Sequence, residues 1–456
     1  MKQLMMILMA LALAGVVGAD DLEVTVYNNG VGLVKEIREL NIERGVHELA
    51  YPGVPERLQP ETVHFLSMRD PDGTRVLEQN YRYDLLNRES LLERYRGQEV
   101  KAWVDGDWRT VRLLAHGSPP SESTPIGRIL EVDGEIHIEG FILPALPEGL
   151  LLEPSLVWLI DSDEGGYHDV ELSYITEGLA WQADYVAVID KANMLDLTAW
   201  VTLDNRSGRA YENARLKLVA GDVKRVSSGV HVRGGRAKEY LMMSDAAPSN
   251  GFAEEQFFEY HLYTLGRPTT ILDREKKQLE LFAETGTEAT RRYLFESWYQ
   301  HEDGEPRALD VSLEFENSKE KGPGVPLPKG IVRVYMEDDS GQLQFAGEDA
   351  IPHTPEDETV RLKVGETFDL RGEHHVLRVD RKHKGRVHEM DIEITLRNHK
   401  DEDTLFTAVE NISRGSEWRL LAHSHDYERL SNGKLQFEVK VPAKGETKVT
   451  YTIRVE

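Results

Sequence analysis

Histidine is the residue type in this sequence with the clearest capacity for chemistry, because eight of its sixteen copies lie after residue 350. The strings H-S-H-D at 423–426 and H-E at 388–389 combine residue types that ligate metals. On a strand, His423 and His425 would point to the same side. A metal site needs three or four ligands that converge, so His388, His423 and His425 are the candidate ligands of a metal centre.

Two other interpretations of these histidines remain open. They are either exposed loop residues, or a pH-sensitive surface on which clustered imidazoles gain charge near pH 6. Ser424 lies in the same string, but the sequence has no G-x-S-x-G elbow. The acidic runs at 337–339 and 401–403 offer oxygen ligands for calcium. No D-x-D-x-D-G loop accompanies them, so solvated turns are expected there.

Aromatic side chains are the second group of candidates. Trp181, Trp200 and Tyr211 could stack on a sugar or a peptide if they lie on an exposed face of a strand. The alternative is a structural role in the core or between sheets, which a sandwich of strands favours. Trp200 sits on the register opposite Leu197, so it lies either on a second covered face or in solvent.

Composition excludes several other kinds of chemistry. The sequence has no cysteine, which removes disulfides, thiolate nucleophiles and cysteine-based zinc or iron sites. Its formal charge of −26, from 80 acidic and 54 basic residues, repels phosphate backbones. The V-R-G-G-R string at 232–236 lacks the spacing of a phosphate-binding loop. We therefore expect no cofactor and no nucleic-acid partner.

The elements that must position these candidates are strands. From 168 to 205 apolar side chains alternate at 170–174 and 195–203, and a denser apolar run covers 185–189. A period of two is typical of a strand with one buried face. Breaks at Gly178 and 191–193 divide the stretch, which predicts three successive strands.

Similar patterns cover the rest of the chain. Short strands separated by Gly and Asp at 99–138 predict a small barrel, and one short helix is predicted near Asn87. Strands are predicted at 256–265 and 276–282, and an edge strand at 292–298 within the polar stretch 283–306. Six or more alternating strands after residue 306 predict an immunoglobulin-like sandwich.

The predicted fold is therefore mainly β. It comprises an N-terminal β region with a small barrel (20–154), a central antiparallel sheet module (155–305) and a C-terminal immunoglobulin-like β-sandwich (306–456). The Gly- and Ser-rich segment 227–255 within the central module is predicted to be flexible or functional.

Residues 1–19 have the pattern of a secretory signal. Lys2 precedes an apolar run at 4–17, and V-G-A at 17–19 supplies small residues before a cleavage site at Asp20. A retained membrane anchor is the alternative, but the run is shorter than the roughly 20 residues that a spanning helix needs. We expect a periplasmic or secreted protein with no transmembrane segment in its mature chain.

Several motifs resemble a known family. The strings L-S-Y-I-T-E-G-L-A-W-Q-A-D-Y (172–185), W-V-T-L-D-N-R-S-G-R-A-Y-E-N-A-R-L-K-L-V-A-G-D-V (200–223) and P-L-P-K-G-I-V-R-V-Y (326–335), and the segment 415–451, are similar to the domain of unknown function DUF 4139. That family includes relatives of the mucoidy inhibitor A group, whose helical coiled-coil insertion this sequence lacks. The resemblance covers about 156 to the end, and V-Y-N-N-G at 26–30 resembles the usual N-terminal extension. It implies a β-rich, exported protein and no catalytic residues.

These observations favour an envelope-associated binding or scaffold protein with a protein or glycan partner. The alternative is a metal-dependent envelope hydrolase built on the C-terminal histidines. A third hypothesis is a purely structural spacer.

Overall fold

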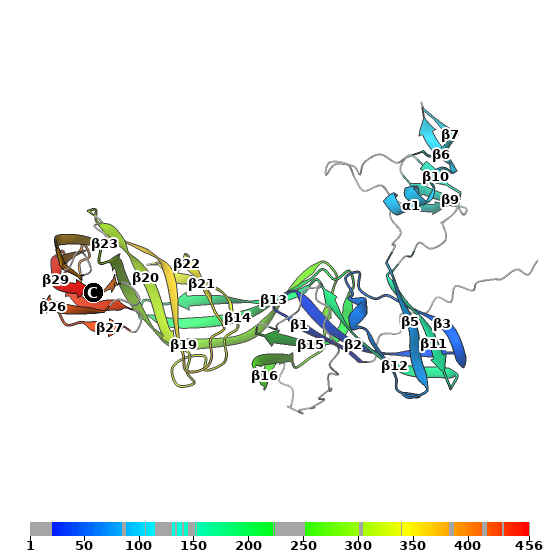
Figure 1. The fold of residues 1–456 in the computed structure, drawn as a ribbon, viewed down its shortest axis with the longest axis horizontal. Coiled ribbons are helices and arrows are strands. Elements are labelled where there is room, and N and C mark those ends of the chain that lie inside the picture. The colour runs from blue at the N-terminus through cyan, green and yellow to red at the C-terminus, as the bar shows by residue number, and fades with distance from the viewer. Residues whose placement is uncertain are drawn as a thin grey trace, which may run out of the picture. The chain divides into compact units, whose positions relative to one another are not determined.

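Strands make up almost all of the regular secondary structure of the described residues (Figure 1). The computed structural model describes residues 21–83, 88–104, 106–114, 130–132, 135–138, 141–144, 151, 153–221, 223, 251–300, 304–338, 340–382, 387–412, 417–430 and 433–455. Among these residues the single α-helix is α1 (Arg88–Arg94), at the position predicted near Asn87. The mainly β class is confirmed.

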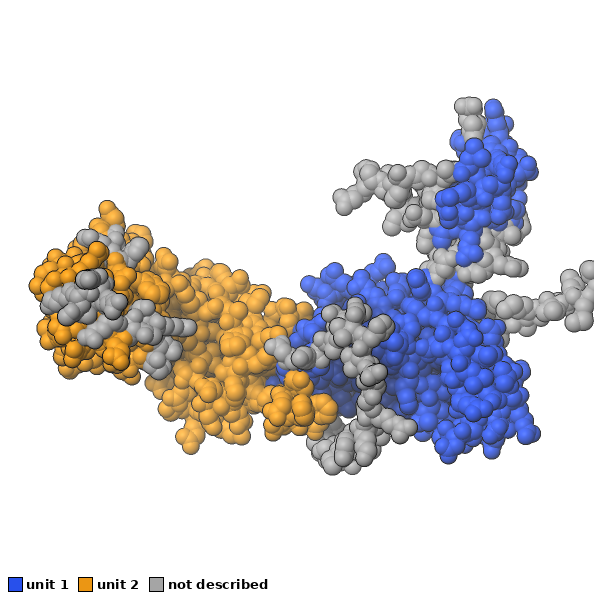
Figure 2. Space-filling model, viewed as in Figure 1, with its two compact units in different colours: residues 1–181, 203–254, 262–277 blue, residues 182–202, 255–261, 278–456 orange. Residues whose placement is uncertain are grey.

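The chain forms two compact units (Figure 2). Unit 1 contains residues 1–181, 203–254 and 262–277, and unit 2 contains residues 182–202, 255–261 and 278–456. The units alternate along the chain, whereas the predicted domains are consecutive. The predicted signal at 1–19 and most of the segment 227–255 lie outside the described residues, but residues 252–255 are strand rather than loop.

An eight-stranded sheet lies mostly in unit 1, although parts of its strands β16 and β17 fall within residues 255–261, which belong to unit 2. Its spatial order is β16 (Phe252–Phe257), β17 (Tyr260–Leu265), β15 (Tyr211–Ala220), β1 (Asp21–Tyr27), β2 (Val31–Ile42), β12 (Gly166–Glu177) and β4 (His64–Ser67), with β18 (Thr269–Ile271) beside β15. The N-N-G turn joins β1 to β2, and Gly30 has a φ of +85°, which glycine adopts without steric cost. β1 also pairs with β15 in parallel, so it is covered on both edges.

Two smaller sheets complete unit 1. One has the order β3 (Gly45–Pro52), β11 (Ser155–Ser162) and β5 (Thr74–Arg82), and the short 3-10 helix η1 (Pro60–Thr62) precedes β4. The other has five strands in the order β7 (Asp107–Arg112), β6 (Glu99–Val104), β10 (Phe141–Leu143), β9 (Glu135–Ile138) and β8 (Leu130–Val132). This sheet occupies the stretch predicted as a small barrel, and it packs Val100 and Ile136 against Leu91 and Leu92 of α1.

Unit 2 is built on a thirteen-stranded sheet. Its main order is β22 (Leu343–Ile351), β21 (Gly330–Glu337), β13 (Leu179–Ile189), β14 (Met194–Asn205), β19 (Glu275–Trp298), β20 (Arg307–Glu316), β23 (Thr359–Lys382), β24 (Val387–Asn398), β29 (Glu446–Val455) and β26 (Trp418–His423). β25 (Thr404–Asn411) pairs with β19 and with β28 (Lys434–Val441), and β28 also pairs with β27 (Glu428–Leu430).

The C-terminal strands enclose a shared apolar core, which the two-residue period builds. Alternate residues of β24, β28 and β29 point inward and are buried. β19 and β25 add Phe295 and Ala408 to the same core. Its members are Phe295, Tyr299, Leu309, Leu370, Met390, Ile392, Ile394, Leu396, Phe406, Ala408, Ile412, Trp418, Leu435, Phe437, Val439, Val441, Val449, Tyr451, Ile453 and Val455.

The three strands predicted within 168–205 are confirmed as β12, β13 and β14. Two other predictions were wrong. The strand at 256–265 is two strands, because the chain turns at Phe258 with a φ of +58°. The segment 275–298 is one continuous strand, β19, and not separate strands at 276–282 and 292–298. Its residues 289–294 pair with β20 and its residues 294–298 pair with β25.

Candidate functional site

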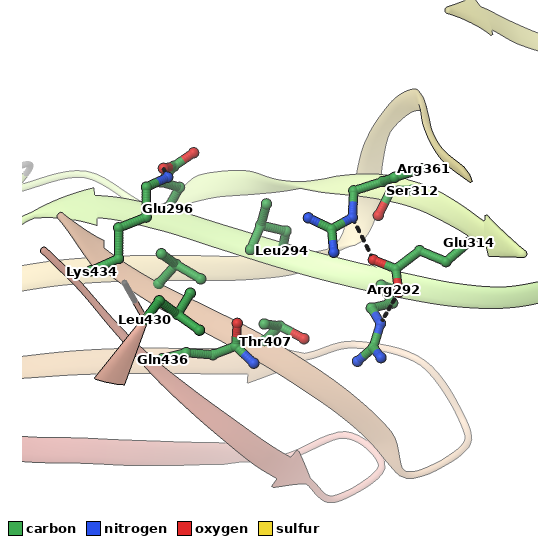
Figure 3. Close-up of a pocket in the computed structure, with 11 residues that line it drawn as sticks. Arg292, Leu294, Glu296, Ser312, Glu314, Arg361, Thr407, Leu430, Lys434 and Gln436 are labelled. Atoms are coloured by element: carbon green, nitrogen blue, oxygen red, sulfur yellow. Dashed lines mark hydrogen bonds and ion pairs between the residues drawn. The ribbon is translucent and has the colours of Figure 1, made fainter. Parts of the chain in front are cut away.

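A groove lies on the outer face of unit 2 (Figure 3). Its volume is ≈ 180 Å³. Arg292, Leu294 and Glu296 form its floor, at successive outward positions of β19. The remaining lining residues come from β20, β23, β25, β27 and β28: Ser312, Glu314, Arg361, Thr407, Val409, Leu430, Lys434 and Gln436.

Strand register explains why these side chains meet. β19 pairs with β25 in parallel, with Leu294 opposite Thr407 and Glu296 opposite Val409. The intervening residue Phe295 points to the opposite face and belongs to the apolar core. The groove therefore lies on the face of the sheet that the core does not use.

Charged side chains fix one end of the groove. Glu314 is 10% exposed and accepts hydrogen bonds from two guanidinium groups. Arg292 Nε lies 2.6 Å from Glu314 Oε2, and Arg361 Nε lies 2.5 Å from Oε1. Because Glu314 is held by both arginines, Arg292 is anchored, while Arg361 remains 67% exposed and faces solvent.

A second ion pair lies at the other end. Lys434 Nζ is 2.6 Å from Glu296 Oε1, which also accepts a hydrogen bond of 2.9 Å from Asn411 Nδ2. Partial burial raises the pKa of Glu296, but the hydrogen bonds from Lys434 and Asn411 lower it by a larger amount. The pKa of Glu296 is therefore below its ordinary value. Glu296 is thus a carboxylate at neutral pH.

The lining of the groove is charged at both ends and apolar in the middle. It holds three cations and two carboxylates, and the carboxylate of Glu438 beside it lies 3.7 Å from Arg292 Nη1, so positive and negative charges are balanced there. Leu294, Val409 and Leu430 make its middle apolar. The lining contains no histidine that could act as a base near neutral pH.

The candidate metal ligands are placed apart. His388 lies on β24 opposite Val455 of β29, and His423 lies on β26 opposite Tyr451 of β29. The two histidines are therefore separated by about 13 Å along the strands and by two strand spacings, about 9.5 Å, across them. This register does not bring His388 to His423.

His425 lies beyond the end of β26, where its backbone oxygen is 3.0 Å from His423 Nδ1. Its own Nδ1 is 2.8 Å from Ser424 Oγ. Within the described parts of the chain, no group of three or more His, Cys, Asp or Glu side chains is arranged to hold a metal ion.

The candidate stacking residues are mostly core residues. Trp181 is 3% exposed, donates from Nε1 to the oxygen of Val219 at 3.2 Å, and packs edge-on against Tyr263. Tyr211 is fully buried, and its hydroxyl is 3.0 Å from Ser207 Oγ. Neither ring has a face in solvent, which is the arrangement that the alternative interpretation, a structural role in the core, predicts. Trp200 is half-buried on β14.

Sequence reasoning missed the groove, although Arg292, Leu294 and Glu296 lie on the edge strand predicted at 292–298, because nothing in that strand was taken as a sign of a ligand. The alternation R-x-L-x-E at 292–296 was the available signal, since it places one apolar and two charged side chains on one face. The partners of these residues lie more than a hundred residues away on β25 and β28, which local patterns do not reveal.

No family model matches this chain, and no curated protein matches it. No helix of the described residues is long and apolar enough to cross a membrane.

Proposed function

We propose that this protein is an exported, envelope-associated binding module that holds an extended segment of a protein partner in the groove of unit 2. The observation that carries the proposal is the arrangement of Arg292, Leu294 and Glu296, which puts an apolar centre between two charged ends. Export rests on the signal-like pattern at 1–19, and the similarity to DUF 4139 fits an exported β-rich protein.

The dimensions of the groove favour a chain segment over a cofactor. Its volume of ≈ 180 Å³ is below the roughly 300 Å³ at which pockets for drug-sized ligands begin, so it accommodates about one side chain. Positions 292 and 296 are about 13 Å apart, the length of about four extended residues. An extended segment therefore spans the groove while one apolar side chain enters its middle.

The charges indicate what flanks that side chain. Arg361 donates to Glu314 through Nε, and its side chain is otherwise exposed to solvent. A carboxylate of the partner can therefore bind the exposed side of its guanidinium group. The partner segment accordingly carries an apolar residue next to an acidic one. Charge-assisted hydrogen bonds of this kind give specificity and faster association.

Site-specific crosslinking tests the proposal. A photo-reactive amino acid replaces Leu430 at the rim of the groove, or Leu343 on β22 of the same unit, where the side chain is 52% exposed. The mature protein is irradiated in envelope extract. The proposal expects one partner segment to be recovered from position 430 and not from position 343.

Binding of the recovered segment is then measured as a synthetic peptide. Leu294→Lys is expected to weaken it by about tenfold or more, while Leu343→Lys leaves it unchanged. Arg361→Ala should weaken only peptides that retain the acidic residue. Equal crosslinking at both positions, or unchanged affinity in Leu294→Lys with an unchanged melting temperature, would refute the proposal.

A further inference from the structure

The hairpin of β6 and β7 in unit 1 ends in two exposed tryptophans. Trp103 and Trp108 are opposite each other in the register, with ring centroids 5.3 Å apart and planes at 71°. The rings are 54% and 42% exposed. Val104 and Asp107 form the next pair, so the turn sequence is Asp-Gly, and Gly106 has the positive φ of +83° that such turns require.

Polar side chains continue the same face of the sheet. Lys101 is opposite Thr110, and Glu99 is opposite Arg112, at alternate positions from the tryptophans. All four are exposed. The intervening residues of β6, Val100 and Ala102, are buried on the other face. The face thus combines two indole rings with hydroxyl, ammonium, guanidinium and carboxylate groups.

The charges on this face are balanced. Lys101 Nζ is 2.9 Å from Glu135 Oε1 of β9, and Arg112 faces Glu99 across the strands. Arg112 Nε also donates to the oxygen of Gly97 at 2.8 Å. A face without net charge does not favour an anionic polymer. Because charged groups lie directly beside the rings, it also lacks the apolar centre of a protein interface.

We propose that this face binds a neutral glycan chain. The C–H face of a pyranose ring packs on an indole, and ring hydroxyls exchange hydrogen bonds with side chains at the edge of the aromatic platform. The two rings meet edge to face, so one ring can present its π face to a sugar while the other ring contacts the side of that sugar. Thr110, Lys101 and Glu99 then supply donors and acceptors along the chain of sugars.

This inference goes beyond the proposed function, since it concerns a different sheet and a different class of ligand. A purely structural role for the tryptophans is the competing explanation, because an edge-to-face pair across two strands stabilises a hairpin. The two explanations differ in what a sugar does to the rings. Only a binding role predicts that a glycan changes their fluorescence.

The test uses the full mature chain, a soluble β-1,4-linked tetramer of N-acetylglucosamine, and intact peptidoglycan. The tetramer should quench tryptophan fluorescence in a saturable manner, and peptidoglycan should retain the protein. Trp103→Ala and Trp108→Ala should each weaken tetramer binding by about tenfold or more. Trp298→Ala is the matched control, since Trp298 is 60% exposed on β19, and it should bind like the wild type.

A second variant separates binding from hairpin stability. Thr110→Val keeps a β-branched side chain and removes only the hydroxyl, so it should weaken tetramer binding without lowering the melting temperature. Leu294→Lys should leave tetramer binding unchanged, which separates this inference from the groove. The inference is overturned if the wild type binds neither the tetramer nor peptidoglycan, or if both tryptophan variants bind them as well as the wild type does. It is also overturned if the two substitutions abolish only the capture of a protein and leave glycan binding unchanged.

Discussion

Replacing Glu36 by glutamine tests the ion pair of Glu36 and Arg209, the most strongly buried one among the described residues of unit 1. Glu36 is fully buried, and Arg209 donates to it through two nitrogens, at 2.9 Å to Oε1 and 2.7 Å to Oε2. Arg38 adds a third contact at 2.9 Å. Burial raises the pKa of Glu36, but hydrogen bonds and charge from Arg209 and Arg38 outweigh it and bring the pKa to about 2.

The magnitude follows from this pKa. A fall from 4.5 to about 2 corresponds to about 3 kcal/mol of folding free energy, because each pH unit is worth about 1.4 kcal/mol. The folded-state pKa is the lower one, so this stability is complete above about pH 4.5 and is lost as the pH falls towards 2. At neutral pH, Glu36→Gln also leaves Arg209 buried without a counter-charge, and it should destabilise unit 1 by about 3–5 kcal/mol.

The assay is urea unfolding at several pH values, with hydrogen exchange of peptides from β2 and β12 to report on unit 1. The difference in free energy of unfolding between wild type and Glu36→Gln should be about 2 kcal/mol smaller at pH 3 than at pH 7, and about 3 kcal/mol smaller at pH 2. Glu39→Gln, an exposed carboxylate on the same strand, is the control. A difference that stays constant over this pH range would refute the reasoning.

Two further changes have expected outcomes. Gly178→Ala should cost about 1–3 kcal/mol more than Gly30→Ala in urea unfolding, because both glycines have a φ of +85° but only at Gly178 would a Cβ meet the oxygen of Arg206, at 2.6 Å. Equal costs would contradict this. Glu410→Leu should lower the melting temperature of unit 2 more than Glu410→Gln, because leucine cannot accept a hydrogen bond and glutamine can. The fully buried carboxylate of Glu410 lies 3.1 Å from His374 Nε2 and accepts a hydrogen bond of 2.6 Å from Tyr451. A larger loss in Glu410→Gln would contradict this.

The strands that the sequence predicts correctly are those whose burial is one-sided and regular. In β14 the residues from Leu195 to Leu203 alternate between buried and partly exposed, so a period of two is visible in the residue types. β19 has no such regularity between 280 and 290, where polar side chains lie on both faces. Its strand conformation depends on pairing with β14, β20 and β25, which lie far away in the sequence.

The candidate sites depended on which face of a strand is covered, and the residue types do not determine this. Trp181 and Trp103 both lie on alternating strands, but Trp181 is 3% exposed and Trp103 is 54% exposed. The difference comes from neighbouring elements. Tyr263 of β17 covers Trp181, whereas Trp103 is opposite Trp108 at the tip of a hairpin. The groove likewise depends on neighbouring elements, since residues of β19, β20, β23, β25, β27 and β28 line it.

The motif D-N-R-S-G-R-A-Y at 204–211 builds part of the interior of unit 1. The amide nitrogen of Asn205 donates to the backbone oxygens of Arg209 and Leu272, at 2.8 Å and 3.0 Å, and its Oδ1 accepts from Ser207. Arg209 continues inward to Glu36.

These contacts satisfy buried backbone and charged groups, which would otherwise cost several kcal/mol each. The motif therefore specifies a turn and an ion pair that the fold requires. A partner in the proposed groove or on the proposed glycan face would contact outward-facing residues such as Arg361 and Trp103, which lie outside this motif. Proteins that share the motif should accordingly share the sheet of unit 1, while their ligands follow from the side chains on its outer faces and on unit 2.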